Sequence, residues 1–300
     1  MKNPVLLLAI AFACFTQEQP GAPAFEAASL KAVAPGRTGL PRLHGGPGTA
    51  SPGQVSGVAT LKALVMRAYG VKEYQVSGPG WMDTQRYELA AKVPAGATEQ
   101  QLAAMLRTFL SARLRMDARL ETRELPIYSL VVAKNGPKLA KSAADDDASG
   151  DPARPPAPRL IAGADGLPDL PPGAQVARSY EVVVAGPDGV LYKRWARRES
   201  MEQLADRLSA VVNRAVVDRT GLAGLYDFTL AWSLESAGGM IRRNGPPPDA
   251  IESRATPVLS DPGLSIFNAL PSQLGLRLEP GKGRVEMVVV TRADRVPAEN

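Results

Sequence analysis

The chain has 300 residues, 45% of them hydrophobic, and a formal net charge of +5. This length exceeds what one small core needs and predicts two domains of ordinary size. With one histidine and one cysteine, the sequence excludes zinc sites of the usual His and Cys spacing and iron–sulfur clusters. The positive charge leaves open a polyanionic partner, such as nucleic acid or an acidic envelope polymer.

Residues 1–24 are predicted to form an export signal. Lys2 provides a short positive region, and residues 5–15 form an uninterrupted apolar run. A membrane-spanning helix needs about 20 apolar residues, so this run is too short to span, and it has the length typical of a signal peptide. We therefore expect an exported protein, periplasmic or extracellular, with no transmembrane segment in the mature chain.

Cys14 lies at the end of the apolar run, which raises the alternative of a lipid anchor at that residue. Ala11, three positions earlier, is a poor substitute for the leucine that is usual in lipoprotein signals. An ordinary residue of the signal is therefore the favoured interpretation. Cleavage after Cys14 would leave a mature chain without a thiol, held together by its core alone.

The first module is predicted over residues 25–141. Apolar residues after Thr60 follow the i, i+3, i+4, i+7 spacing of one helix face, and Thr98 with Gln101 forms a capping box for a second helix. Residues 36–53 are glycine-rich and are expected to be a loop. In chain order we predict strands 25–31 and 54–58, a helix after Thr60, strand 74–77, the loop GPGWMD, strand 87–93, helix 98–114 and a hairpin of strands 115–123 and 127–133.

Residues 142–178 contain DDDASGDPARPPAP and are predicted to be a flexible, disordered linker. The second module follows over residues 179–300, with a polar insertion at residues 236–263 and a capping box formed by Ser200 and Gln203. We predict strands 180–185 and 191–197, a helix after Ser200, strand 215–218, the loop TGLAG, strand 226–232, helix 264–274 and a hairpin of strands 276–279 and 285–292 around Pro280-Gly281-Lys282-Gly283.

The two series of elements follow the same order, which indicates an internal duplication. The repeated unit is described by the order ββαββαββ. We therefore predict an α+β fold made of two such copies, with mixed or antiparallel sheets that are each covered by two helices.

Motifs for catalysis and cofactor binding give no positive signal. His44 lies in the predicted loop RLHGGPG, without the GxSxG sequence of a hydrolase triad, and is expected to be exposed. Gly46-Pro47-Gly48 lacks the third glycine of a dinucleotide-binding loop, and residues 145–147 are consecutive aspartates without the alternation of a calcium loop. Ser29 and Lys31 share one strand face, where two solvated polar residues are favoured over a Ser–Lys dyad. We predict no catalytic residue, no metal and no cofactor.

Two charged segments bear on the partner. In residues 115–123 the charges alternate in sign at every second position, which indicates a solvated strand and not the one-sign stripe of a nucleic-acid site. We therefore expect no nucleic-acid partner. The segment RWARRE, residues 194–199, is more basic, and together with Tyr192 and Trp195 it could bind an acidic polymer. The alternative is that it forms an exposed face of an edge strand.

Trp81, in the loop GPGWMD, is a second candidate for binding. A large aromatic residue flanked by glycine and proline often marks a contact surface, which Asp83 and Arg86 would extend. The alternative is that Trp81 fills the gap between helix and sheet, with Asp83 capping the turn and Arg86 paired to it.

Several segments occur together in an order that resembles one family. They are FEAASLK, TLKALVMRAYGV, YQVSGPGWMDTQRYELAAKVP, LETRELPIYSLVVAKNGPKL, VVDRTGLAGLYDFTLAW and a tail ending in PAEN. The chain resembles the soil-associated secreted protein family typical of acidobacteria, which is uncharacterised and often multi-copy. The resemblance covers nearly the whole chain outside the linkers and implies export and an unknown function, with no established catalytic residues. The longer polar insertions, and Ala instead of a bulkier residue in FEAAS, depart from the family pattern.

Some relatives in that family carry this domain beside a membrane-bound peptidase of the antibiotic-sensing type, which implies envelope sensing by analogy. The repeated helix-strand-strand unit is also similar to the N-terminal modules of secretins, which bind other envelope proteins.

Three functions remain open from the sequence, and we favour them in this order. The first is a non-catalytic interaction module of the cell envelope or exterior, which captures an envelope protein or polymer through a strand edge or the Trp81 loop. The second is a ligand sensor with a pocket between the two copies. The third is a hydrolase that uses carboxylates alone. The acids near predicted loops are Asp83, Glu88, Asp227 and Glu235.

Overall fold

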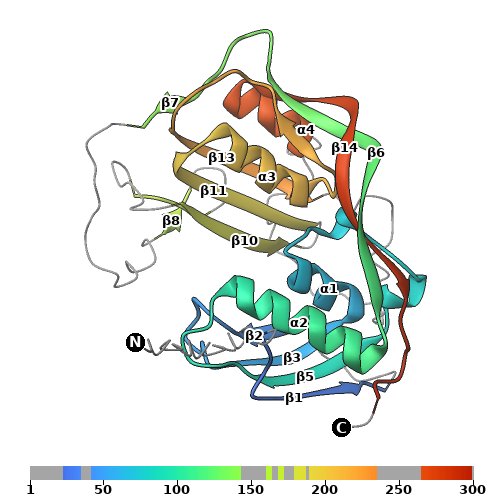
Figure 1. Ribbon diagram of the computed structural model, residues 1–300. Helices are drawn as coiled ribbons and strands as arrows, with labels where there is room; N and C mark the ends of the chain where they lie inside the picture. The colour runs from blue at the N-terminus through green and yellow to red at the C-terminus, as the bar shows by residue number, and fades with distance from the viewer. Residues whose placement is uncertain are drawn as a thin grey trace, which may run out of the picture. The chain divides into compact units, whose positions relative to one another are not determined.

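The computed structural model describes residues 23–34, 42–142, 160–163, 168–171, 179–186, 189–234 and 265–298 (Figure 1). The described chain has a mixed α+β fold, as predicted, and divides into two compact units. Unit 1 contains the described residues up to Glu121 and those from Glu286 onward, and unit 2 contains those from Thr122 to Val285. Unit 1 is therefore built from both ends of the chain.

Unit 1 is a four-stranded antiparallel sheet with two helices on one face. The strand order is β1-β5-β3-β2, and helices α1 and α2 share one core with the sheet (Figure 1). The elements are β1 Ala27–Ala32, β2 Arg42–Gly45, β3 Gln54–Thr60, α1 Leu61–Tyr69, the 3-10 turn η1 Glu73–Gln75, β4 Val76–Ser77, the 3-10 turn η2 Gly80–Asp83, β5 Arg86–Lys92 and α2 Glu99–Leu114.

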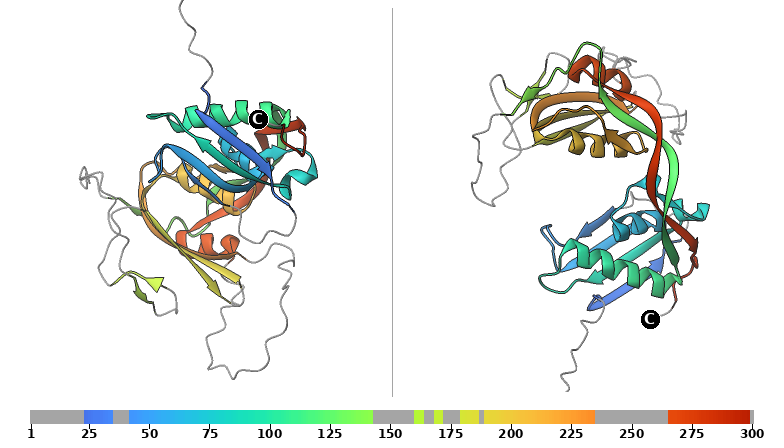
Figure 2. Two further views of the ribbon diagram at one scale, coloured as in Figure 1. Left: turned by 90° about the horizontal axis from the view of Figure 1, so that it is seen from below. Right: turned by 45° about the horizontal axis from the view of Figure 1, so that its top comes forward.

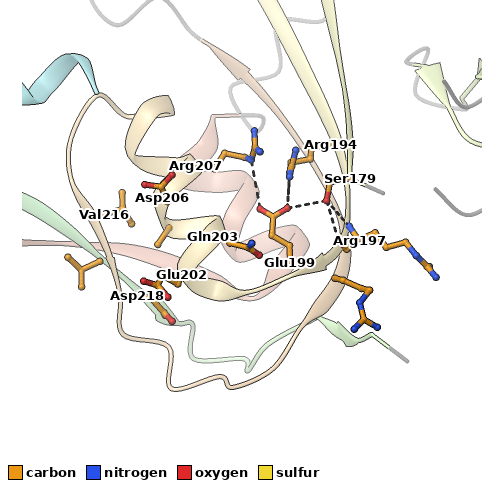
Figure 3. A pocket seen from close by; sticks show the side chains of 13 residues that line it. Ser179, Arg194, Arg197, Glu199, Glu202, Gln203, Asp206, Arg207, Val216 and Asp218 are labelled. Carbon is orange, nitrogen blue, oxygen red and sulfur yellow. Dashed lines mark hydrogen bonds and ion pairs between the residues drawn. The ribbon is translucent and has the colours of Figure 1, made fainter. Parts of the chain in front are cut away.

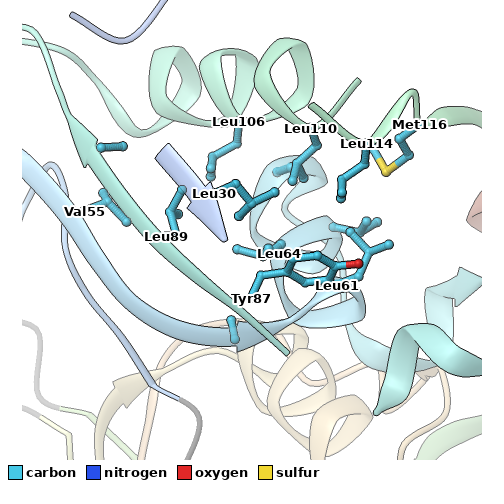
Figure 4. Close-up of a cluster of buried hydrophobic side chains, with 14 of the residues drawn as sticks. Leu30, Val55, Leu61, Leu64, Tyr87, Leu89, Leu106, Leu110, Leu114 and Met116 are labelled. Atoms are coloured by element: carbon cyan, nitrogen blue, oxygen red, sulfur yellow. The ribbon is translucent and has the colours of Figure 1, made fainter. Parts of the chain in front are cut away.

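Alternation along β5 builds the core of unit 1. Tyr87 and Leu89 are buried on one face of the strand, whereas Glu88 between them is exposed on the other. Leu106 and Leu110, one turn apart on α2, lie over this apolar face (Figure 4). Full burial of such a side chain is worth about 1.5–3 kcal/mol, so the packed face holds the helices against the sheet.

Three predicted helix starts are confirmed, one that was predicted from apolar spacing and two that were predicted from capping boxes. Thr60 Oγ1 accepts a hydrogen bond from Ala63 N at the start of α1. Thr98 with Gln101 forms a reciprocal capping box at the start of α2, and Ser200 with Gln203 does the same at α3. Each cap satisfies backbone N–H groups that have no partner within the helix.

Unit 2 contains a second four-stranded antiparallel sheet, in the order β10-β11-β13-β7. Helices α3 and α4 share a core with this sheet, in which Leu204, Leu230 and Leu270 are at most 1% exposed. The elements are β7 Ala140–Lys141, β8 Ile161–Ala162, β9 Pro168–Asp169, β10 Tyr180–Gly186, β11 Gly189–Glu199, α3 Met201–Val211, β12 Val216–Asp218, β13 Tyr226–Leu234, α4 Ile266–Ala269 and the π-helical turn η4 Leu270–Leu274.

The predicted helix over residues 264–274 is shorter than expected and changes form along its length. It begins as α4 and continues as the π-helical turn η4. Pro271 lies at the start of η4 and has no N–H to donate, which removes one hydrogen bond of the α-helical ladder at that point.

The two predicted hairpins are wrong. Residues 115–133 do not fold back, because they form one strand, β6 Asp117–Val132, and residues 276–292 likewise form one strand, β14 Leu276–Arg292. These long strands are neighbours in a third sheet of order β12-β6-β14-β4, and they lie side by side in Figures 1 and 2. Each of them begins in one unit and ends in the other.

Local chemistry explains why neither hairpin turn forms. Gly281 and Gly283 lack the positive φ that tight hairpin turns require. A Cβ built on Gly283 would lie 2.6 Å from Ile127 Cδ1, so this glycine permits close approach of β14 to β6 instead of a turn. Pro126 lies in β6 outside the segment that pairs with β12, which runs from Tyr128 to Leu130.

Other predictions fall partly outside the described residues. The expected loop at residues 36–53 contains β2, which pairs with β3. Within the predicted linker at residues 142–178, the described residues include β8 and β9, which pair with each other. Residues 1–22 of the predicted signal and the insertion at residues 236–263 lie outside the described residues. Among the helices that the structure describes, none is long and apolar enough to cross a membrane.

Candidate functional site

The candidate residues of unit 1 form packing contacts. Trp81 on η2 is half-buried against the core, and the Arg295 guanidinium lies 5.5 Å from its ring centroid. Asp83 Oδ1 lies 2.9 Å from Lys62 Nζ. Arg86 is the first residue of β5 and pairs with Thr60 of β3. Trp81 therefore packs against the core of unit 1, and Asp83 forms an ion pair with Lys62.

Tyr192 and Trp195 are three positions apart on β11, and they face opposite sides of the sheet. Tyr192 stacks on Trp232, with ring centroids 5.2 Å apart, while Trp195 stacks on Tyr180 at 6.3 Å. The expected edge-strand face is wrong, because β11 lies between β10 and β13 and Arg194 is only 5% exposed. These aromatic residues therefore do not form one surface.

The face of β11 that carries Trp195 lies against β9. Asp169 Oδ2 is 3.0 Å from Lys193 Nζ, which also lies 5.5 Å from the Trp195 ring centroid. Burial alone would raise the pKa of Asp169, but hydrogen bonds from Lys193 and Leu170 N and the Lys193 charge outweigh it and lower the pKa. Lys193 is 6% exposed, so its ammonium group depends on this carboxylate.

On the opposite face, a β-bulge brings Arg194 and Glu199 together. Two residues five positions apart in a regular strand point to opposite faces. The β11–β13 register shifts by one residue between Ala196 and Glu199, and Arg198 in that stretch has φ of 50°. The extra residue turns Glu199 to the face of Arg194, where both side chains are buried.

Asp227 on β13 holds this bulge in place. Its Oδ1 accepts hydrogen bonds from Arg198 N at 2.8 Å and from Ser142 Oγ at 2.6 Å, and Arg197 Nη1 lies 3.6 Å from Oδ2. Burial would raise the pKa of Asp227, but these hydrogen bonds and the two arginine charges outweigh it and lower the pKa. The Asp227 carboxylate therefore stabilises the backbone of the bulge by accepting the hydrogen bond from Arg198 N.

The Glu199 carboxylate is only half satisfied. Arg194 Nη2 and Nε both donate to Oε2, the latter at 3.2 Å, and Ser179 Oγ lies 3.5 Å from the same oxygen. Oε1 is buried and has no hydrogen-bond partner. Arg207 Nε lies 3.8 Å from Oε1, and Arg207 Nη1 lies 3.7 Å from Glu181 Oε2.

These residues border a cavity of about 940 Å³, which we call the Glu199 pocket (Figure 3). It lies between the end of β11, the first turns of α3 and β12. Its volume falls in the range of small-molecule sites, roughly 300–1,000 Å³. The charged side chains that line it are Arg194, Arg197, Arg198, Glu199, Glu202, Asp206, Arg207 and Asp218.

A second, smaller cavity of about 260 Å³ adjoins the same helix. Trp232 and Tyr192 line it with Glu181 and Arg207, so Arg207 borders both cavities. The Trp232 Nε1 donor is buried and has no hydrogen-bond partner. Among the described residues of unit 2, one buried acceptor and one buried donor on the helix-facing side of the sheet are thus without a partner.

Residues 62–293 match the sequence family described as Protein of unknown function (DUF3738). The chain belongs to this family. No curated protein and no solved structure matches the chain. The family description assigns no activity, so the site must be interpreted from its geometry.

The remaining candidate acids and nucleophiles are dispersed. Within the described ranges, no three His, Cys, Asp or Glu side chains group as metal ligands would. His44 is exposed, as predicted, but it lies in β2 instead of a loop. Glu88 is exposed on β5, and Glu235 lies outside the described residues. Ser29 and Lys31 both lie on β1.

Sequence reasoning did not find the Arg194–Glu199 pair, although Arg194 begins and Glu199 ends the segment RWARRE. The spacing gives the wrong face unless the bulge is known, and nothing in the segment itself marks a bulge. Arg207 and Glu181 were also missed, since each is a common surface residue type whose role depends on what β11 places beside it.

Proposed function

We propose that this chain is an exported, non-catalytic binding protein of the cell envelope or exterior, and that its ligand occupies the Glu199 pocket. The observation that carries the proposal is the buried Oε1 of Glu199, which lacks a donor beside a cavity of ligand size. A buried polar atom without a partner costs about 1–3 kcal/mol, and more when it is charged. A bound ligand that donates to this oxygen removes that cost.

Binding explains this site better than catalysis does. Arg194 donates twice to one oxygen of Glu199, which fixes the orientation of the carboxylate as an acceptor. Asp227, one of the acids considered for a hydrolase, is engaged by Arg198 N and Ser142. Asp83, another of them, forms an ion pair with Lys62 in unit 1. Asp227 and Asp83 are thus engaged in structural contacts, which favours a binding site over a hydrolase that uses these acids.

Export is part of the proposal and rests on the N-terminal sequence and on the resemblance to a soil-associated secreted family. When the full chain is produced in a Gram-negative bacterium, we expect it outside the cytoplasm, shortened by roughly the predicted signal of 1–24. Mass spectrometry of the recovered protein measures the cleavage point. A charged residue in the apolar run, as in Leu7→Arg, should retain the chain in the cytoplasm. Export of that variant would contradict the signal assignment.

We also infer that the two units are copies of one module that exchange their last strands. β3, α1, β4 and β5 recur in order as β11, α3, β12 and β13. β3 is antiparallel to β5, as β11 is to β13. The short strand β4 pairs in parallel with β14, and its counterpart β12 pairs in parallel with β6. The short strand β4 of the first copy therefore pairs with β14, the last strand of the second copy. The short strand β12 of the second copy pairs with β6, the last strand of the first copy.

Native mass spectrometry of the exported protein tests the binding function. The wild-type chain should carry a small molecule, and Glu199→Gln should lose it while Glu124→Gln, an exposed carboxylate on β6, keeps it. A bound molecule that is unaffected by Glu199→Gln would place the site elsewhere. A partner protein captured equally by both variants would favour an interaction surface outside the pocket.

A further inference from the structure

The chemistry of the Glu199 pocket narrows the class of ligand, if the proposed binding function holds. Glu199 lines the cavity and is 4% exposed, and its buried Oε1 has no hydrogen-bond partner (Figure 3). An unpartnered carboxylate oxygen can be satisfied only by a hydrogen-bond donor, and a cationic donor gives the strongest bond. The group that meets this oxygen is therefore a hydrogen-bond donor such as an ammonium, a guanidinium, an amide or a hydroxyl, and an ammonium or a guanidinium gives the strongest bond.

Arg207 already offers a guanidinium, but its geometry does not suit the site. Its Nε and Nη1 lie 3.8 Å from Glu199 and 3.7 Å from Glu181, beyond hydrogen-bond distance in both cases. The planar group is shared between two carboxylates and bonds to neither. Its side chain is 43% exposed, so it can move aside into solvent at little cost.

The rest of the lining favours a cation over an anion. Four arginines line the cavity, of which Arg194 pairs with Glu199 and Arg197 with Asp227. Glu202 and Asp218 border the same cavity. Asp218 uses Oδ1 to accept Thr220 N at 2.8 Å, and its carboxylate charge remains on the cavity wall. With Asp206, a cation that enters would meet four carboxylates, of which Glu199 already pairs with Arg194.

We propose that the Glu199 pocket binds a small organic amine, whose ammonium group replaces Arg207 over Glu199 Oε1. An ammonium is compact and carries three donors that can turn toward several acceptors, unlike the fixed fork of a guanidinium. It can therefore approach Oε1 where Arg207 does not. The ligand is either a linear amine or an amino sugar, and both present an ammonium group.

Calorimetric titration of the full mature chain with matched probes tests this inference. Cadaverine represents linear amines and glucosamine represents amino sugars, while 1,5-pentanediol and glucose are their neutral counterparts. We expect saturable binding of at least one amine and no measurable binding of its neutral counterpart. The amine that binds identifies the source. Equal binding of an amine and its neutral counterpart would overturn the proposal.

Two variants locate the binding. Glu199→Gln should lower the affinity for the amine at least tenfold, and Glu124→Gln should leave this affinity unchanged. Because Glu199→Gln also disturbs Arg194, a second variant is needed that leaves this pair intact. Arg207→Ala removes the competing guanidinium, so it should tighten amine binding several-fold. Weaker amine binding by Arg207→Ala would contradict the replacement of Arg207.

The outcomes separate this inference from the proposed function. If the exported chain retains a molecule without an amine, in a Glu199-dependent manner, and binds neither amine probe, the ligand class is wrong and the binding function stands. If the wild-type chain retains nothing and binds no probe, both are wrong.

Discussion

Arg194 and Glu199 form a buried ion pair whose stability depends on both partners. Their side chains are 6% and 5% exposed, and Arg194 donates two hydrogen bonds to one carboxylate oxygen. Desolvation of two charges offsets most of their attraction, so such a pair adds little net stability. Removal of one partner is a different matter, because it leaves a single charge buried.

Arg194→Met should therefore lower the free energy of unfolding by about 3–5 kcal/mol, as measured by urea denaturation. The double variant Arg194→Met with Glu199→Met should recover most of this loss, since no unpaired charge remains. The exposed pair Arg119–Glu121 provides the control, and Arg119→Met should cost less than about 1 kcal/mol. Equal losses of unfolding free energy in Arg194→Met and Arg119→Met would contradict the interpretation of Arg194–Glu199 as a buried ion pair.

The lowered pKa of Asp227 makes the bulge sensitive to acid. The ionised carboxylate is favoured in the folded protein, so its contribution is complete above the unfolded aspartate pKa of about 3.9 and is lost as pH falls through the lower folded value. Asp227→Asn should be less stable than wild type at pH 7, and the difference should shrink below about pH 4. Urea midpoints across pH measure it.

Ser142→Ala removes one donor to Asp227 and should give a smaller loss with the same pH dependence. A difference between wild type and Asp227→Asn that stays constant down to pH 2 would show that the carboxylate charge does not stabilise the bulge.

At the scale of elements, the C-terminal segment completes helix α2. Asp294 N donates to Leu114 O and Ala298 N to Arg113 O, each at 2.7 Å, which satisfies two carbonyls that the helix end leaves free. Tyr87 OH donates to Arg295 O at 2.8 Å. Burial raises the pKa of Tyr87 to about 12, although the Arg295 charge opposes this, so the hydroxyl stays protonated well above neutral pH.

Deletion of residues 293–300 should lower the free energy of unfolding by about 2–4 kcal/mol, from three hydrogen bonds at roughly 0.5–1.5 kcal/mol each. Tryptophan emission should shift to longer wavelength, since Trp81 loses the Arg295 side chain over its ring. Val296 is 75% exposed, and Val296→Ser is a control that should change neither measurement. Unchanged stability after the deletion would contradict the capping role.

The whole molecule is held together by two strands that each serve both units. Val288 and Val290 of β14 belong to the core of unit 1, whereas Leu130 of β6 belongs to the core of unit 2. Contacts between residues so far apart in sequence close long loops. Each unit therefore depends on a strand that the sequence analysis assigned to the other module.

A fragment of residues 23–141 should therefore be much less stable than unit 1 in the full chain, because it lacks Val288 and Val290. Fusion of residues 286–298 to this fragment through a flexible linker should restore a cooperative urea transition, followed by circular dichroism. A fused segment with Val288→Asp should not restore it. If the unfused fragment unfolds at the urea concentration of the full chain, the strand exchange is not needed for folding.

Local sequence was enough to predict most elements of the fold. The capping residues Thr60, Thr98 and Ser200 mark helix starts because they satisfy N–H groups within three residues, a relation that the chain carries in itself. The alternation along β5 similarly predicts a half-buried strand. The candidate site was less predictable, because RWARRE was interpreted as an exposed surface, and its burial depends on β10 and β13.

The sequence by itself determined where the capped helices begin, which faces of them are apolar, and which segments carry charge, since these depend on neighbours within a few residues. Only the tertiary structure decided which strands pair. It replaced two expected hairpins with β6 and β14, because long-range burial of Val288 and Leu130 outweighs a local turn at Gly281 and Gly283. It also brought Arg194 beside Glu199, since a bulge changes the face on which every later side chain lies.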